Sequence, residues 1–144
     1  MKLDRLVLAF ASTLASCGGG SDAPMNANNA FPSEPYASLT TQAGIYRVEV
    51  RTAPAQPPLR GDLDVEVRIV DAKGAPVDGL ALGVVPWMPT HAHGTSVVPP
   101  VTAEGSGRYH VVHVELFMPG TWQLRMTFGE NGGVDNAVVP IDVL

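Results

Sequence analysis

The chain has 144 residues, with nine Lys and Arg against fourteen Asp and Glu and a formal net charge of −5. This length suits one domain with short extensions, and the acidic balance argues against nucleic-acid binding, which needs a basic face. Because 45% of the residues are hydrophobic and only 16% are charged, a disordered acidic tail is excluded as well. Fifteen glycines and thirteen prolines favour a turn-rich β domain over a helical bundle.

The N-terminal residues have the features of a secretory signal. An apolar run over residues 6–11 follows Lys2 and Arg5; it is too short to span a bilayer and is typical of a signal peptide. The run leads into Leu14-Ala15-Ser16-Cys17, which resembles the lipobox of bacterial lipoproteins. The sequence therefore predicts a lipoprotein signal peptide over residues 1–16 and lipid attachment, palmitate included, at Cys17. The alternative is a soluble protein with a chance cysteine.

The lipobox carries an expectation about location. It implies a protein of the cell envelope, held by its lipid on the periplasmic side of a membrane. Residue 18 is Gly rather than Asp, which in proteobacterial lipoproteins points to the outer membrane. Several acyl chains give near-permanent anchoring, whereas a single chain does not.

Residues 17–43 are rich in Gly, Ser, Asn, Ala and Pro and contain few large apolar side chains. Such a composition is typical of a flexible linker. Phe31 and Tyr36 offer an alternative, in which this segment packs back on the domain. We expect the lipidated cysteine and linker over 17–43 and the folded domain over 44–144.

The folded domain shows strand-like alternation of apolar and polar residues. In 62–70, for example, Leu63, Val65, Val67 and Ile69 alternate with charged residues, a period of two that indicates a half-buried strand. In chain order the pattern predicts strands over 45–51, 62–70, 80–85, 107–115, 121–128 and 134–143. About seven short strands at such spacing predict an all-β, immunoglobulin-like two-sheet β-sandwich. The turn before Tyr109 looks like a tyrosine corner, in which the phenol binds a loop backbone.

All four histidines fall between residues 91 and 113. If His91-Ala92-His93 is extended, both imidazoles project to one side with their Cα atoms about 6.5–7 Å apart, close enough to converge on one ion. Imidazole suits zinc and copper, whereas the thioether of the nearby Met88 favours Cu(I). Acidic residues are absent from 85–94, which argues against Mg²⁺ and Ca²⁺. The pattern thus favours a copper site, with zinc as the weaker alternative.

Each histidine taken singly also has a structural interpretation. The alternation places His113 on the same face as Tyr109 and Val111, where it is either a hydrogen-bonded core histidine or a further ligand. It places His110 on the opposite face, exposed to solvent. Met126 shares a face with Trp122, so we assign it to the core.

Three segments carry a resemblance to a known family. They are Met88-Pro89-Thr90-His91-Ala92-His93-Gly94, then residues 107–109, then residues 117–124 with Met118-Pro119-Gly120 and Trp122. In this order they resemble the YtkA-like (FixH-related) domain family over roughly residues 45–128. The resemblance implies a small extracytoplasmic sandwich, often tethered to a membrane and associated with copper handling and cytochrome-oxidase assembly. It also implies Met88, His91, His93 and Met118 as metal ligands, to which we add His113 on geometric grounds.

Two functions remain open at this point. The first is a lipid-anchored extracytoplasmic domain that binds copper and delivers it to a copper-accepting protein of the envelope. The second is a non-metal, immunoglobulin-like interaction domain of a surface lipoprotein. We expect no enzyme, because no strand–Ser–helix elbow is present and a domain of about one hundred residues leaves little room for a substrate cleft. A zinc hydrolase with Glu104 or Glu115 as base is the remaining enzymatic alternative.

Overall fold

The computed structural model describes residues 31–129 and 133–144. The predicted signal peptide over 1–16, the lipid attachment at Cys17 and most of the predicted linker lie outside these residues. No helix long and apolar enough to cross a membrane occurs within the described ranges.

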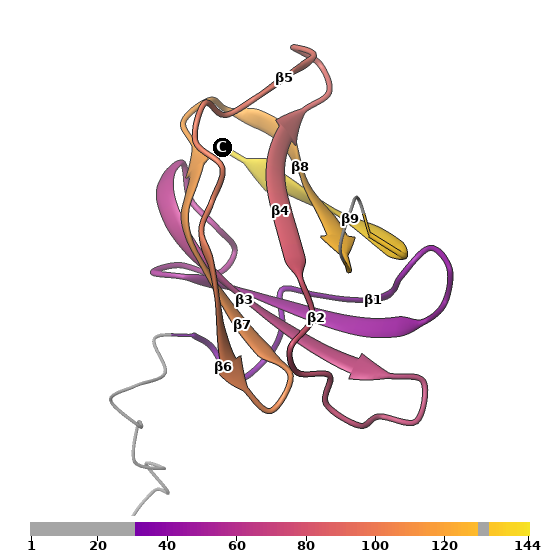
Figure 1. The fold of residues 1–144 in the computed structure, drawn as a ribbon. Helices are drawn as coiled ribbons and strands as arrows, with labels where there is room; N and C mark the ends of the chain where they lie inside the picture. The colour runs from indigo at the N-terminus through magenta and orange to yellow at the C-terminus, as the bar shows by residue number, and fades with distance from the viewer. Residues whose placement is uncertain (1–30, 130–132) are drawn as a thin grey trace, which may run out of the picture.

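The described residues form two antiparallel sheets that face each other (Figure 1). The five-stranded sheet has the order β1-β2-β3-β7-β6, and the four-stranded sheet has the order β5-β4-β8-β9. The all-β, immunoglobulin-like sandwich predicted from the alternation is therefore confirmed. The strands are β1 (Ala37–Thr40), β2 (Tyr46–Ala53), β3 (Gly61–Asp71), β4 (Leu82–Met88), β5 (His93–Gly94), β6 (Val101–Gly105), β7 (Arg108–Leu116), β8 (Gly120–Phe128) and β9 (Asp135–Val143).

Six of these strands are those that the alternation predicts, and three short strands (β1, β5 and β6) escape it. A strand of two to five residues is too short to show a clear period of two. The linker prediction is consequently wrong for its last part, because β1 lies within 17–43 and pairs with β2. The amide of Tyr36 also donates to the carbonyl of Val50 at 2.7 Å. A segment with the composition of a linker thus becomes a strand, because its backbone pairs with the edge of the sheet.

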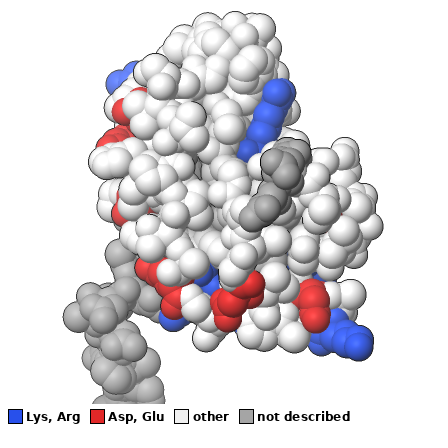
Figure 2. Space-filling model, in the orientation of Figure 1, with Lys and Arg blue, Asp and Glu red and all other residues white. Residues whose placement is uncertain are grey.

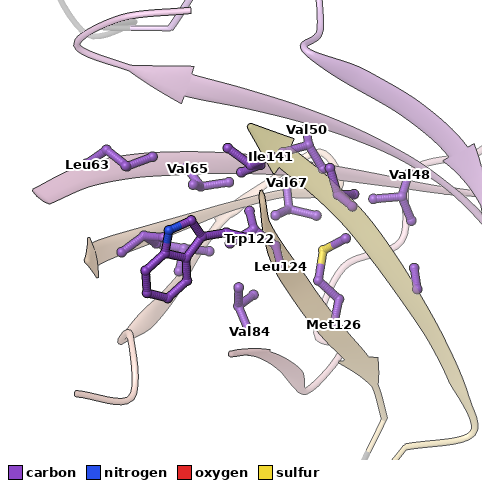
Figure 3. Packing of buried hydrophobic residues seen from close by; sticks show 14 of the residues in the cluster. Val48, Val50, Leu63, Val65, Val67, Val84, Trp122, Leu124, Met126 and Ile141 are labelled. Atoms are coloured by element: carbon purple, nitrogen blue, oxygen red, sulfur yellow. The ribbon is translucent and has the colours of Figure 1, made fainter. Parts of the chain in front are cut away.

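The core lies between the two sheets and is built from their inward-facing side chains (Figure 3). Alternate residues of β8, for example Trp122, Leu124, Met126 and Phe128, are all buried, as the alternation predicts. Burying an aliphatic or aromatic side chain of this size contributes about 1.5–3 kcal/mol relative to leaving it exposed. Because the chain has one cysteine, no intrachain disulfide is available and this apolar core has to stabilise the fold.

The hydroxyl of Tyr109 closes one end of the sandwich and binds a loop backbone, as predicted. Its partners lie 29 and 32 residues upstream and not a few residues upstream as in a tyrosine corner, so that name was wrong; we call the contact the Tyr109 corner. The buried hydroxyl donates to the carbonyl of Val77 at 2.8 Å and accepts from the amide of Leu80 at 3.0 Å. The preceding Gly107 has a φ of +72°, and a Cβ there would overlap the carbonyl oxygen of Ile69. Only glycine fits this backbone without strain. The corner therefore fixes the loop between β3 and β4 against β7.

Candidate metal site at the β4–β5 turn

The turn between β4 and β5 brings His91 and His93 to the upper end of the sandwich in Figure 1. The amide of His91 donates to the carbonyl of Met88 at 3.2 Å, and Ala92 lies in the left-handed region with a φ of +54°. Residues 89–92 therefore form a tight turn and not an extended segment. The expectation of an extended His91-Ala92-His93 is wrong, since only His93 is in a strand. The turn nonetheless keeps both rings at the same end of the domain.

The two imidazole rings lie close together and are solvent-exposed. Their centroids are 5.6 Å apart and their planes are nearly perpendicular, at 86°. Two imidazoles on a shared ion have centroids roughly 5–6 Å apart when each nitrogen–metal distance is about 2.0–2.1 Å. The observed separation therefore suits a shared metal ion.

His93 has a hydrogen bond that leaves one ring nitrogen available. Its Nδ1 lies 2.9 Å from the carbonyl oxygen of Gly94, so Nδ1–H donates to that carbonyl. This fixes the tautomer in which Nε2 carries a free lone pair. A backbone carbonyl that accepts from the other ring nitrogen is a common support of metal-bound histidines.

Met88 connects this turn to the core. It is paired with His93 in the register of β4 and β5, and directly opposed residues project to the same face with Cβ atoms about 4.5–5.5 Å apart. The Met88 side chain is buried, with 1% exposed, and its Cε lies 3.0 Å from where a Cβ on Gly120 would be. The side chain of Met88 therefore lies on the core side of the turn, next to Gly120.

Met118 lies in the neighbouring loop between β7 and β8, two residues before Gly120. Its side chain packs against the core while its carbonyl accepts a hydrogen bond from Nε1 of Trp122 at 2.9 Å. Because Met88 contacts Gly120, this loop and the end of β4 meet at the same end of the sandwich. The structure thus gathers Met88, His91 and His93 around the turn and holds Met118 in the adjacent loop.

His113 lies elsewhere. A β-bulge in β7 places Val112 and His113 opposite a single position of β3, between the pairs Val65–Val111 and Leu63–Val114. This extra residue, at a φ of +58°, reverses the alternation, as bulges do. His113 is consequently exposed on the outer face, and its predicted placement on the face of Tyr109 is wrong. The structure does not bring it to the His91–His93 pair.

On that outer face His113 binds a carboxylate. Its Nδ1 is 3.1 Å from Oδ2 of Asp62. This hydrogen bond, followed by the negative charge of Asp62, raises the pKa of His113 above its ordinary value. The carboxylate of Asp62 therefore favours the protonated form of His113 on this exposed face.

His110 is on the face opposite Tyr109, as predicted, and is half-buried. Its Nε2 is 3.0 Å from Oδ2 of Asp64, and its Nδ1 is 3.5 Å from Oε1 of Glu104. Both ring nitrogens therefore face carboxylates, partners that sequence reasoning missed because they come from β3 and β6. Among the described residues no group of three or more His, Cys, Asp and Glu could hold a metal ion. A metal centre here therefore depends on the methionine sulfurs.

A family model matches residues 40–127, under the description YtkA-like. The chain belongs to the YtkA-like family. The match includes the β4–β5 turn, residues 107–109 and the loop with Met118, the three regions that carry the resemblance in the sequence. The comparison with curated proteins finds no match for this YtkA-like chain. Neither the family nor the all-β fold is typical of enzymes.

Proposed function

We propose that this YtkA-like domain binds copper at the β4–β5 turn, and that it captures or delivers the metal in the cell envelope. The observation that carries the proposal is the pairing of Met88 with His93, with the ring of His91 5.6 Å from that of His93. Two imidazoles with one or two thioethers form a donor set that suits Cu(I), and zinc has little affinity for thioethers. Met118 is the candidate for a fourth donor. His113 is left out of the set because it belongs to the other sheet.

The surroundings of the turn support an exchangeable site. Residues 88–103 and 116–124 contain no Asp, Glu, Lys or Arg, and the very top of the molecule in Figure 2 is white, with blue side chains below it on both sides. Val98 and Phe117, in the loops that follow β5 and β7, are 76% and 57% exposed. Contiguous exposed apolar surface marks protein–protein contacts, and these two side chains are candidates for such a contact. A copper-accepting protein would approach the exposed histidines beside Arg125, whose guanidinium stacks on Trp87 at 4.6 Å.

Lipid anchoring at Cys17 belongs to the same proposal and has its own test. Cells expressing the chain are fed an alkyne-labelled palmitate, and label on the protein is compared between wild type and Cys17→Ala. We expect label only in the wild type, and the wild-type chain in the outer-membrane fraction. Label that persists in Cys17→Ala would overturn the assignment of Cys17, and a wild-type chain in the soluble fraction would overturn the anchor.

The metal proposal is tested by titrating Cu(I) into the purified chain in competition with a chromophoric chelator. His91→Ala/His93→Ala should weaken Cu(I) binding at least about 100-fold, which corresponds to about 2.7 kcal/mol. The matched control is His110→Ala/His113→Ala, which removes two histidines from the other sheet and should leave the affinity unchanged. Equal affinities of wild type and His91→Ala/His93→Ala would overturn copper binding here. The interaction domain without metal would then be the better description.

A further inference from the structure

A hollow of about 550 Å³ lies on the outer face of the five-stranded sheet, where β1, β2 and β3 run side by side. It is on the other sheet from the β4–β5 turn, and the proposed function makes no use of it. Its polar lining includes the side chains of Ser38, Thr40, Arg47 and Arg68, with Glu49 between the two arginines. The hollow therefore combines two guanidinium groups with two hydroxyl groups.

The strand register explains why these groups converge. Thr40 of β1 is directly opposite Arg47 of β2, and in the next row Ser38 is opposite Glu49, which is opposite Arg68 of β3. All of them point outward because the alternate residues of β2 and β3 are buried. Arg47 and Arg68 are thus diagonal neighbours, within reach of one small ligand.

The turn after β3 closes the hollow on one side. Nη2 of Arg47 lies 3.3 Å from where a Cβ on Gly74 would be. The guanidinium of Arg47 is therefore held against the backbone of this turn, and the glycine leaves room for it. Val70 adds an apolar wall, whereas Leu39, which also borders the hollow, packs its side chain against the core.

Most of the basic residues share this face with carboxylates of the same strands (Glu49, Asp62, Asp64, Glu66 and Glu115). Of the seven Lys and Arg in the described ranges, five belong to the outer face of β2, β3 and β7 or to the turn beside it: Arg47, Arg51, Arg68, Lys73 and Arg108. Arg68 and Arg108 are direct cross-strand partners, an arrangement of like charges that is unfavourable without a counterion.

Of the carboxylates on this face, Glu49 is the one that lines the hollow. Oε2 of Glu49 is 3.0 Å from Nη2 of Arg51 but 3.7 Å from Nη1 of Arg68, so a single oxygen is shared. Among the described residues no carboxylate lies within 4.0 Å of the guanidinium of Arg47 or Arg108. Nε of Arg108 is also buried without a hydrogen-bond partner. The lining of the hollow therefore has two guanidinium groups and one carboxylate.

We infer that this hollow binds an oxyanion, the phosphate or carboxylate group of a small molecule or of a lipid headgroup. A guanidinium presents paired N–H donors that match the oxygens of either group, and the hydroxyls of Ser38 and Thr40 add further donors. The volume lies in the range of small-molecule sites, and the apolar wall formed by Val70 accommodates a short carbon skeleton. Because Glu49 repels additional negative charge, the ligand carries one oxyanion group rather than several.

The test is a titration of inorganic phosphate at constant ionic strength, followed by ¹H–¹⁵N NMR on the full chain with Cys17→Ser, which prevents lipidation. Saturable shifts are expected at the amides of Ser38, Thr40 and Gly74. Arg47→Gln and Arg68→Gln should each weaken binding at least about tenfold. Arg125→Gln, an arginine of the other sheet that stacks on Trp87 at 4.6 Å, should not change it. Shifts that do not saturate, or that Arg125→Gln weakens equally, would overturn the site.

Vesicles distinguish the two sources of the oxyanion. The same chain is sedimented with phosphatidylglycerol vesicles and with phosphatidylcholine vesicles. If the chain sediments with phosphatidylglycerol vesicles and Arg47→Gln abolishes this, the ligand of the site is a lipid headgroup. If the chain binds phosphate saturably but does not sediment with these vesicles, the ligand is a soluble molecule. Copper affinity does not enter either measurement, so the proposed function and this inference fail independently.

Discussion

Met88 and His93 are direct partners across the β4–β5 pair, yet one is buried in the core and the other is exposed to solvent. A metal ion held by both would therefore connect the folded core to the surface turn. The unfolded chain loses this register, so binding at the turn has to favour the folded state. This relationship leads to the first two predictions.

Cu(I) should raise the thermal stability of the domain. At a free Cu(I) concentration one hundred times the Kd, a ligand that binds only the folded state contributes about 2.7 kcal/mol. A calorimetric melt with and without Cu(I) measures the shift in Tm. His91→Ala/His93→Ala should melt at the same temperature with and without the metal, and a copper-dependent Tm in that variant would contradict the turn as the binding site.

Met88→Leu should separate the packing role of Met88 from its role as a donor. The substitution conserves side-chain volume, so it should cost less than about 1.5 kcal/mol of unfolding free energy. Because leucine has no sulfur, Cu(I) affinity should fall by at least about tenfold. Met126→Leu, in another buried methionine of the four-stranded sheet, is the matched control. Equal Cu(I) affinities for the two variants would remove Met88 from the donor set.

Tyr109→Phe should destabilise the domain by about 1–3 kcal/mol, because it leaves the amide of Leu80 and the carbonyl of Val77 without their shared partner. Tyr46→Phe is the control, since the described residues form no hydrogen bond with the Tyr46 hydroxyl and its ring packs on Phe128 at 5.8 Å. Urea unfolding compares the two variants. A Tyr109→Phe variant as stable as Tyr46→Phe would show that the corner contributes no net stability.

Gly107→Ala should be more damaging than Gly44→Ala. Both glycines have positive φ angles, +72° and +76°, so either alanine costs about 1 kcal/mol of backbone strain. Only at Gly107 does the added Cβ also overlap backbone, at Ile69, whereas at Gly44 nothing lies within 4 Å. The difference in unfolding free energy between the variants measures this overlap. Equal losses would mean that the loop moves aside.

The ion pair of His113 should be visible in a pH titration. Its hydrogen bond to Asp62, then the charge of Asp62, raises the pKa in the folded state, so the contribution to stability is present below the unfolded pKa of about 6.5. That contribution is lost as the pH rises through the folded pKa. By NMR, Asp62→Asn should lower the titration midpoint of His113, and Glu115→Gln should lower it less. A midpoint unchanged in Asp62→Asn would exclude this pairing in solution.

Local pattern was sufficient for most of the strands and for the binding of a loop backbone by Tyr109. Alternation over seven to ten residues identifies a half-buried strand because one face of each sheet must enter the core. The turn before Tyr109 was predictable because its glycines lie in one short segment, whereas the partners Val77 and Leu80, 32 and 29 residues away, were not. In β7 the same reasoning failed at His113, where one extra residue reversed the faces. A bulge is set by the pairing of two strands, so the alternation of one strand does not reveal it.

Residue type and spacing in the sequence determined which side chains could bind a metal, since His91 and His93 are neighbours and Met88 is close by in the chain. Tertiary structure alone decided that Met88 is paired with His93, that Met118 comes to the same end, and that His113 goes to the other sheet with Asp62. Arg47 and Arg68 converge for the same reason. Contacts between residues far apart in the chain follow from strand order and register, which depend on the packing of the whole domain.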